Sequence, residues 1–173
     1  MNALSPPDAE ALYASLVEQL RGWLAQQAAA PTLVGIYAGG AWLAERLHTE
    51  LALPTPLGVI SSTYHRDDFA TRGLHPNGNR TTLPFDVNGR AILLVDDVLY
   101  TGRTTRAAIN ELYDFGRPAR VDLAVLVDRG GRELPICAQL CAGRVELAPE
   151  RMLELRRADA ATPRFEFLES DSR

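Results

Sequence analysis

The chain contains no lysine, because all eighteen of its basic residues are arginine. Schiff-base chemistry and general-base catalysis by a lysine amine are therefore excluded, whereas planar guanidinium groups suit the binding of phosphate and carboxylate. The formal net charge is -4 at pH 7, and no block of basic residues occurs. This balance gives no electrostatic support for strong nucleic-acid binding by a single chain.

Cysteine is scarce, and long apolar runs are missing. Cys137 and Cys141 are the only thiols, and no histidine lies near them in the sequence to complete a zinc site, so we expect buried free thiols. Every apolar run is shorter than the roughly 20 residues that span a bilayer. The N-terminus also lacks the basic start and apolar core of a signal peptide. We therefore expect a cytoplasmic protein with no membrane partner.

Two common phosphate-binding signatures are missing as well. The sequence has neither the Gly-x-x-x-x-Gly-Lys-Ser/Thr pattern of P-loop proteins nor a Gly-x-Gly-x-x-Gly pattern after a strand. Their absence argues against nucleoside-triphosphatase and dinucleotide-binding functions. With 173 residues, of which 46% are hydrophobic, the chain suits a single domain over residues 1–173 with a sizeable core.

The pattern along the chain alternates between strands and helices. Apolar residues recur at helical spacing after Asp8, a suitable N-cap, and Pro31 follows this first helix. Further helices are expected through residues 42–51 and 104–115, and strands at residues 32–37, 57–64, 91–95, 121–127, 138–141, 145–147 and 152–156. The tail, residues 159–173, is expected to be frayed. Such alternation predicts an α/β fold with a mainly parallel sheet and right-handed crossovers.

Residues 65–84 form a long segment with little periodicity. They contain histidine, arginine and aspartate side chains together with glycine and proline. Loops longer than about 12 to 15 residues inside compact domains are usually functional lids or disordered segments. We therefore expect a flexible loop that closes over a ligand. His65 and His75 within it are expected to be surface residues rather than ligands or bases.

Residues 92–105 carry the most informative pattern, Ile-Leu-Leu-Val-Asp-Asp-Val-Leu-Tyr-Thr-Gly-Arg-Thr-Thr. The apolar run at residues 92–95 is typical of a strand that is covered on both faces of a parallel sheet. Asp96 and Asp97 follow it at the carboxyl edge, where α/β folds bind small molecules. Two neighbouring carboxylates in a cleft need hydroxyl donors or a cation beside them. A ribose diol and a magnesium ion supply both.

A hydroxyl-rich glycine loop follows the two carboxylates. Gly102 lets the backbone approach a ligand closely, and Thr101, Thr104 and Thr105 offer hydroxyls beside the free amides of a helix N-terminus. A monophosphate fits such a loop. The alternative is an ordinary buried strand followed by an Asp turn and a Thr N-cap. The ordered combination of all parts favours a sugar-phosphate site.

This segment resembles the phosphoribosyl pyrophosphate (PRPP) motif of type I phosphoribosyltransferases. Three other segments resemble one family in that group, the pyrimidine operon attenuator/uracil phosphoribosyltransferase (PyrR) family: Tyr-His-Arg-Asp-Asp at 64–68, Asp-Phe-Gly-Arg-Pro-Ala at 114–119 and Val-Asp-Arg-Gly-Gly-Arg-Glu-Leu-Pro-Ile at 127–136. The resemblance covers about residues 8–157. It implies the type I phosphoribosyltransferase fold, with a small hood on the base side, and a homo-oligomer.

The resemblance also implies roles for the motif residues. Asp96 and Asp97 hold the ribose hydroxyls, and residues 101–105 wrap the 5-phosphate. The full set of PRPP-binding residues is Asp96, Asp97, Val98, Thr101, Gly102, Arg103, Thr104 and Thr105. Uracil attacks the anomeric carbon of PRPP and yields UMP and pyrophosphate, with Mg²⁺ carried by PRPP and without direct protein ligands to the metal. In the long loop, Arg66 and Asp67 join the catalytic set by closing, with Asp68, over pyrophosphate.

The pyrophosphate loop departs from the family pattern. Many relatives carry Lys-Thr-Arg-Gly where this chain has Tyr37, Ala38, Gly39 and Gly40. A base, a hydroxyl and one guanidinium are therefore missing, although backbone amides at the following helix N-terminus can still bind an anion. Arg72 and Arg80 are candidates to replace the missing base. The alternative is that the two glycines serve only as a strand-to-helix turn.

On the base side, the resemblance places the pyrimidine after the last core strand, against Val127, Asp128, Arg129 and Arg132. Uracil alternates carbonyl and N–H groups, so backbone groups near Val127 can recognise it; the alternative is a charged turn. Relatives often have His in place of Gly131 and Arg in place of Cys137, groups associated with nucleotide or RNA contact. Arg132 and Arg144 remain as candidate RNA contacts.

Three functions stay open on the sequence alone. The first is a uracil phosphoribosyltransferase that uses Mg²⁺ and PRPP. The second is a regulator that senses UMP or UTP, binds the leader of pyr messenger RNA and has little transferase activity; phosphate contacts would make its RNA affinity steeply dependent on salt. The third is a phosphoribosyltransferase for another base, such as orotate or a purine.

Overall fold

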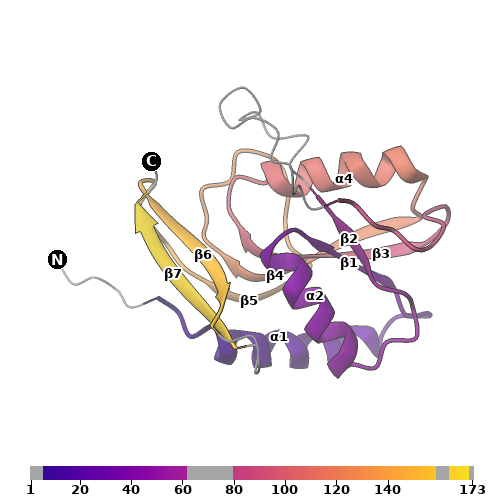
Figure 1. Ribbon diagram of the computed structural model, residues 1–173, viewed down its shortest axis with the longest axis horizontal. Coiled ribbons are helices and arrows are strands. Elements are labelled where there is room, and N and C mark those ends of the chain that lie inside the picture. The colour runs from indigo at the N-terminus through magenta and orange to yellow at the C-terminus, as the bar shows by residue number, and fades with distance from the viewer. Residues whose placement is uncertain (1–5, 62–79, 159–163, 172–173) are drawn as a thin grey trace.

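The computed structural model describes residues 6–61, 80–158 and 164–171. Along the chain the elements are α1 (Ala9–Leu24), β1 (Thr32–Ile36), α2 (Gly39–Glu50), β2 (Gly58–Ile60), β3 (Ala91–Leu99), α4 (Arg103–Phe115), β4 (Arg120–Asp128), β5 (Leu140–Arg144), β6 (Arg151–Arg157) and β7 (Phe165–Asp171) (Figure 1). Five parallel strands form one sheet in the order β2-β1-β3-β4-β5, and β6 and β7 form a separate antiparallel pair. The predicted α/β fold with a mainly parallel sheet is confirmed.

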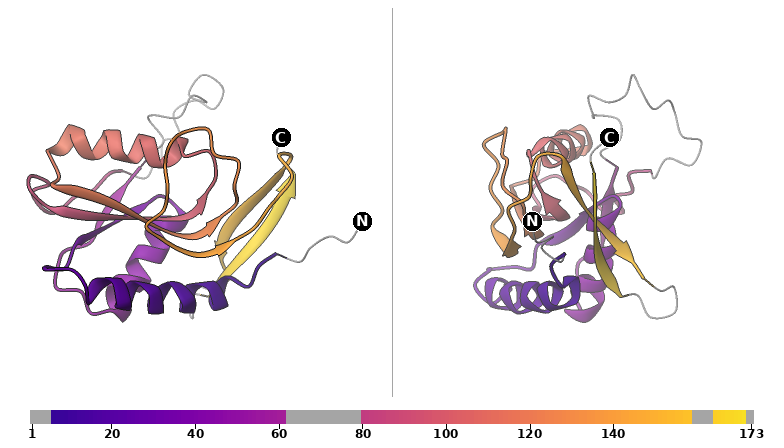
Figure 2. Two further views of the ribbon diagram at one scale, coloured as in Figure 1. Left: turned by 180° about the vertical axis from the view of Figure 1, so that it is seen from behind. Right: turned by 90° about the vertical axis from the view of Figure 1, so that its left-hand side faces the viewer.

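Helices cover both faces of the parallel sheet. α1 and α2 lie on one face and α4 on the other, while the β6–β7 hairpin stands at one end of the molecule (Figures 1 and 2). Leu93 and Val95 of β3 belong to the apolar cluster under α1 and α2, whereas Ile92 and Leu94 belong to the cluster under α4. The central strand is therefore buried on both faces, which explains why its sequence lacks polar alternation.

Two helices begin close to where the sequence indicated. The carboxylate of Asp8 accepts hydrogen bonds from the backbone amides of Glu10 and Ala11 at 3.0 and 3.1 Å, which confirms it as the N-cap of α1. Gly102 precedes α4 with a φ of 91°. Glycine adopts this left-handed conformation without strain, so the residue gives the chain its sharp turn from the motif strand into the helix.

The motif strand is longer than predicted. β3 continues to Leu99, because its last residues pair with β4 at Val98↔Val127 and Leu99↔Asp128. The expectation that the strand ends at Val95 is therefore wrong. The two carboxylates lie within the strand, so the sheet, and not a turn, fixes their backbone.

The C-terminal part also differs from the prediction. Residues 165–171, expected to be frayed, form β7 and pair along their length with β6, so that expectation is wrong for them. Phe165 and Phe167 are buried in the cluster under α1 and α2, and this apolar burial holds the tail. Residues 145–147 form no strand, and β5 instead completes the edge of the parallel sheet.

An ionic network fixes the hairpin to the two helices beside it. The guanidinium of Arg46 in α2 donates two hydrogen bonds to the carboxylate of Glu10 in α1, at 2.8 and 2.9 Å. Its central carbon lies 3.9 Å from the ring centroid of Tyr13 and 5.1 Å from that of Phe165. Glu10 also accepts a hydrogen bond of 2.7 Å from the backbone amide of Phe165. The network thereby joins α1, α2 and β7.

The cysteines only partly follow the expectation from composition. Cys137 is exposed, so the prediction that it is buried is wrong, and Cys141 is half-buried; both are free thiols. Among the described residues, no helix combines the length and apolar character that a membrane crossing requires.

Candidate active site

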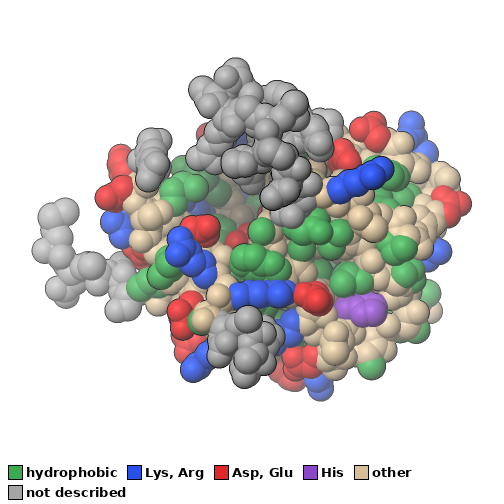
Figure 3. Space-filling view, viewed as in Figure 1, with side chains coloured by type: hydrophobic (Ala, Val, Ile, Leu, Met, Phe, Trp, Pro, Cys, Tyr) green, Lys and Arg blue, Asp and Glu red, His purple; other side chains and the backbone are tan. Residues whose placement is uncertain are grey.

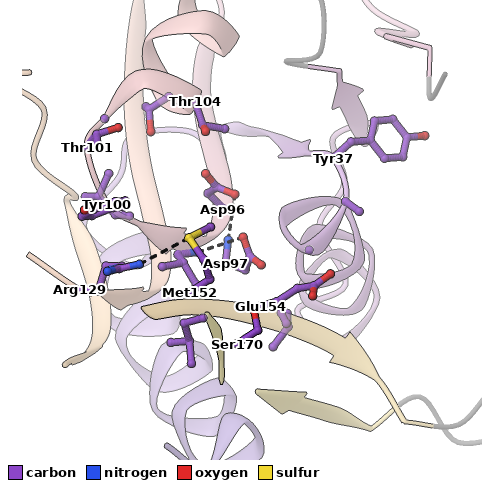
Figure 4. A pocket seen from close by; sticks show the side chains of 18 of the residues that line it. Tyr37, Asp96, Asp97, Tyr100, Thr101, Thr104, Arg129, Met152, Glu154 and Ser170 are labelled. Atoms are coloured by element: carbon purple, nitrogen blue, oxygen red, sulfur yellow. Dashed lines mark hydrogen bonds between the residues drawn. The ribbon is translucent and has the colours of Figure 1, made fainter. Parts of the chain in front are cut away.

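A cavity of about 690 Å³ lies at the carboxyl ends of β1 and β3, and the β6–β7 hairpin forms its far wall (Figure 4). Cavities of this size are typical of small-molecule sites. Its lining residues come from the start of α2, the end of β3 with the following loop, the end of β4 and the hairpin: Tyr37, Ala38, Gly39, Trp42, Asp96, Asp97, Val98, Leu99, Tyr100, Thr101, Gly102, Thr104, Thr105, Arg129, Met152, Leu153, Glu154, Leu155, Ser170 and Asp171.

The two carboxylates predicted to hold a sugar both face this cavity. Asp96 is buried, and its Oδ1 accepts a hydrogen bond of 3.0 Å from the amide of Asp97. Oδ1 of Asp97 accepts one of 3.0 Å from the amide of Val98. The next backbone amide thus helps to orient each carboxylate. Carboxylate oxygens accept hydrogen bonds, so this wall of the cavity suits hydroxyl donors.

The predicted phosphate loop wraps one end of the cavity. Four of its residues line the wall: Thr101, Gly102, Thr104 and Thr105. The hydroxyl of Thr105 is buried and has no hydrogen-bond partner among the described residues. A buried hydroxyl without a partner costs free energy, and a phosphate oxygen would satisfy it. Arg103, by contrast, points toward Glu133, with its Nε 2.8 Å from Oε2, and does not line the cavity.

The glycines of the pyrophosphate loop allow α2 to pack directly against the motif strand. A Cβ at Gly39 would overlap the carboxylate of Asp97, and a Cβ at Gly40 would overlap the carbonyl oxygen of Val95. Ala38 and Gly39 line the cavity, whereas Gly40 is buried behind it. Both positions therefore require glycine because α2 lies so close to β3. A simple strand-to-helix turn would not require two glycines.

Of the four residues predicted to contact the base, only one lines the cavity. Arg129 lines the cavity; Val127, Asp128 and Arg132 do not. Arg132 forms an ion pair of 2.6 Å with Asp128, donates to the carbonyl oxygen of Ile136 at 2.9 Å and also contacts the carbonyl oxygen of Tyr100. Burial raises the pKa of Asp128, but the hydrogen bonds from Arg132 and from a backbone amide outweigh it and lower that pKa. This pair holds the loop together.

Several residues of the cavity wall were not singled out from the sequence. They are Trp42 at the start of α2, Tyr100 after the motif strand, and the hairpin residues Met152, Leu153, Glu154, Leu155, Ser170 and Asp171. The alternation of Leu153 and Leu155, and of Phe165 and Phe167, with polar residues was a usable signal for the hairpin. No local pattern indicated that the hairpin folds back over the motif strand.

The other predicted site residues lie away from the cavity wall or outside the described residues. Arg66 and Asp67, assigned to the lid, belong to the part of the chain that the structure does not describe, as do His65, Asp68, Arg72 and His75. Arg80 and Arg144 are described and exposed, and neither lines the cavity. Arg80 therefore does not replace the missing loop base in this conformation.

Comparison with known proteins shows a phosphoribosyltransferase domain and fold. The family model of the phosphoribosyl transferase domain matches residues 8–143. The solved hypoxanthine phosphoribosyltransferase of Staphylococcus aureus superposes with a TM-score of 0.61 at 19% identity, covering 80% of this chain and 75% of that one. A purine phosphoribosyltransferase of Pyrococcus horikoshii gives a TM-score of 0.56 at 23% identity, covering 80% of this chain and 83% of that one. At these identities the structural likeness shows the fold alone.

Sequence relatives are much closer. The bifunctional protein PyrR of Ralstonia nicotianae is 54% identical over 162 residues, which cover 92% of each chain. That of Nitrosococcus oceani is 48% identical over 153 residues, covering 87% of this chain and 86% of the relative, and that of Pseudomonas aeruginosa is 42% identical over 153 residues, covering 88% and 90%. The chain therefore belongs to the PyrR family within the type I phosphoribosyltransferases.

Proposed function

We propose that this protein transfers the phosphoribosyl group of PRPP to uracil, forming UMP and pyrophosphate. The observation that carries the proposal is the pair Asp96 and Asp97, which faces a cavity whose neighbouring wall is a hydroxyl-rich loop with an unsatisfied buried Thr105 hydroxyl. Oriented carboxylates suit a ribose diol, and the loop suits a monophosphate. Membership of the PyrR family favours uracil as the base.

The reaction needs positioning more than it needs a nucleophilic side chain. N1 of uracil forms a bond to the anomeric carbon as the bond from that carbon to pyrophosphate breaks, and the N1 proton is released to solvent. The sugar passes through an oxocarbenium-like transition state. Asp96 and Asp97 fix the ribose, the loop from Thr101 to Thr105 fixes the 5-phosphate, and the amides at the start of α2 face the leaving group. These contacts hold the reacting atoms in line.

Magnesium enters this reaction as part of the substrate. Four acidic residues line the cavity, Asp96, Asp97, Glu154 and Asp171, against the single basic residue Arg129 among the described lining residues. Because PRPP is itself highly anionic, it suits this wall only with a cation bound to its oxygens, and Mg²⁺ prefers oxygen ligands. Asp96 and Asp97 would hold the Mg²⁺–PRPP complex by its ribose. The metal would offset negative charge on the pyrophosphate.

A regulatory role is the second proposed function, favoured by the naming of the relatives as bifunctional. In this role the protein binds UMP or UTP in the same cavity, and an assembled homo-oligomer in the cytoplasm binds the pyr messenger RNA leader. The single chain carries mixed charges: on the face in Figure 3, arginine and acidic side chains are interspersed over the described residues. RNA binding would thus need arginines from several chains on one surface.

The test of the proposed activity is a comparison of nucleobases. Purified protein is incubated with Mg²⁺, PRPP and, separately, uracil, orotate or hypoxanthine, and the nucleotide product is quantified. UMP formation from uracil, with at most a hundredth of that rate for the other bases, is the expected result. Equal or faster turnover of orotate or hypoxanthine would assign another base, and absence of any nucleotide would leave only the regulatory role. A gel-shift titration with the leader transcript at two salt concentrations tests that role.

A further inference from the structure

Residues 130–136, which we call the strap, follow β4 and run along the phosphate loop. The chain turns at Gly130 and Gly131, whose φ angles of 71° and 67° glycine adopts without strain. A Cβ at Gly131 would overlap the Tyr100 ring, and the guanidinium carbon of Arg129 lies 3.8 Å from the centroid of that ring. No residue of the strap lines the cavity. The strap therefore contacts the loop on the side that faces away from the ligand space.

Backbone contacts join the strap to the phosphate loop. The amides of Glu133 and Leu134 both donate to the carbonyl oxygen of Thr101, at 3.0 and 3.1 Å. Two strap side chains pack on the next residue of the loop: a Cβ at Gly102 would lie 3.3 Å from Cδ1 of Ile136 and 3.4 Å from Cβ of Leu134. The strap thus supports consecutive residues of the loop.

Arg132 is the strap side chain that ties three segments together. Its guanidinium donates to the carbonyl oxygen of Tyr100 in the loop, to that of Ile136 in the strap at 2.9 Å, and to the carboxylate of Asp128 at the end of β4 at 2.6 Å. The side chains of Arg132 and Asp128 are only 24% and 18% exposed. Charge-assisted hydrogen bonds with this much shielding hold their geometry better than exposed ion pairs do. Arg132 therefore fixes the direction of the Tyr100 carbonyl.

The direction of these carbonyls sets the direction of the amides that follow them. A trans peptide is planar, so its C=O and N–H groups point in opposite directions. Because the carbonyls of Tyr100 and Thr101 point to the strap, the amides of Thr101 and Gly102 point the other way, toward the cavity that both residues line. These two amides have no acceptor within the described part of the chain. Converging amides of this kind bind an anion.

We propose that Arg132 is a positioning residue for the 5-phosphate: it holds the Tyr100 carbonyl on the strap and thereby aims the Thr101 amide at the phosphate. The inference rests on the proposed function, and it gives Arg132 a role in place of the base contact expected from the sequence. Arg132 does not line the cavity, so it acts through the loop. Without it, binding must order the loop peptide, and that ordering costs affinity.

The test measures binding of the phosphate and of the base separately. Arg132→Met removes the donors and keeps an extended side chain. We expect its dissociation constant for PRPP with Mg²⁺, measured by calorimetry, to rise about tenfold, and its KM for uracil at saturating PRPP to stay within about twofold of the wild type. Arg106→Met, which removes an exposed arginine from α4, is the control and should match the wild type. Unchanged PRPP affinity in Arg132→Met, with or without a raised KM for uracil, overturns the proposal.

Two further variants separate position from charge and from folding. Arg132→Lys keeps the charge but not the planar fork that reaches several acceptors, so most of the loss in PRPP affinity should remain. Full recovery by lysine would mean that charge alone matters and overturns the proposal. If Arg132→Met does not fold, Asp128→Asn replaces it, because it keeps Arg132 and removes the charge that orients it. Asp128→Asn should raise the dissociation constant for PRPP about threefold; wild-type affinity would overturn the proposal.

Failure of the proposed activity is distinguishable from failure of this inference. If the wild type forms no UMP, calorimetry with UMP and uridine, which differ only in the 5-phosphate, replaces the kinetics. Arg132→Met should then weaken binding of UMP about tenfold and leave binding of uridine unchanged. Equal losses for the two ligands, or no loss, overturn the inference. A wild type that binds neither PRPP nor UMP overturns the proposed function together with it.

Discussion

Gly39 lies against the carboxylate of Asp97 so closely that a Cβ at position 39 would overlap Oδ2, Cγ and Cβ of that side chain. The start of α2 and the end of β3 therefore lie so close together that position 39 has no room for a side chain. This contact explains the glycine at this position of the pyrophosphate loop. An arginine at position 39 would therefore require the Asp97 side chain to move from its place at the cavity wall.

Substitution of Gly39 should weaken PRPP binding. Gly39→Ala is expected to raise the dissociation constant for PRPP by about tenfold or more, and Gly39→Arg by at least as much, measured by calorimetry with Mg²⁺. Gly22→Ala in α1 is the matched control, since a Cβ there meets nothing within 4 Å. That control should bind PRPP normally and gain about 0.5–1 kcal/mol in unfolding free energy. Tighter binding by Gly39→Arg would show that the loop rearranges freely.

The buried hydroxyl of Thr105 should contribute to PRPP binding rather than to the stability of the fold. Thr105→Val keeps the shape and removes an oxygen that has no partner among the described residues. We expect the unfolding free energy to stay constant or rise by up to about 1 kcal/mol, and the dissociation constant for PRPP to rise about tenfold. Urea unfolding and calorimetry measure the two quantities. Thr49→Val, on the exposed side of α2, is the control; lost stability with intact binding in Thr105→Val would contradict the assignment.

Acid should weaken the attachment of the hairpin through Glu10. The hydrogen bond from Arg46 lowers the pKa of Glu10, burial opposes it, and the Phe165 amide lowers it further. Because the folded pKa lies below the unfolded one, the stabilisation is present above the ordinary glutamate pKa of 4.5 and is lost as the pH falls through the folded value.

The corresponding variant is Glu10→Gln. It should lose about 1–3 kcal/mol of unfolding free energy at pH 7, and the difference from the wild type should shrink below about pH 4.5. Urea unfolding at several pH values measures this. Glu18→Gln, whose exposed carboxylate lies 3.9 Å from Arg21, should change stability by less than about 0.5 kcal/mol. A pH-independent difference for Glu10→Gln would mean that the carboxylate charge is not what holds β7.

Local patterns sufficed to predict the motif strand, its carboxylates and the threonine loop. Residues 92–95 are buried on both faces, as their unbroken apolar run indicated. Asp96, Asp97 and Thr105 all line the cavity, because their places follow from one strand, one turn and one helix start that are adjacent in the sequence. The N-cap at Asp8 was predictable for the same reason.

Long-range contacts were beyond the sequence pattern. The overlap between Gly39 and Asp97, and the stacking of Arg129 on Tyr100, join residues on different elements whose spacing is set by the sheet. The hairpin is a similar case. Apolar and polar residues alternate along its strands. The network of Glu10, Arg46 and Phe165 that attaches the hairpin joins residues from opposite ends of the chain, so the local sequence indicated a frayed tail.

The central claim is that Asp96 and Asp97 bind the ribose of PRPP, and calorimetry of the doubly substituted protein tests it most directly. With both residues changed to asparagine, PRPP with Mg²⁺ should release no measurable heat, while the circular dichroism spectrum stays that of the wild type. Asp114→Asn, an exposed carboxylate on α4, should bind as the wild type does. Undiminished PRPP binding by the folded double variant would contradict the account.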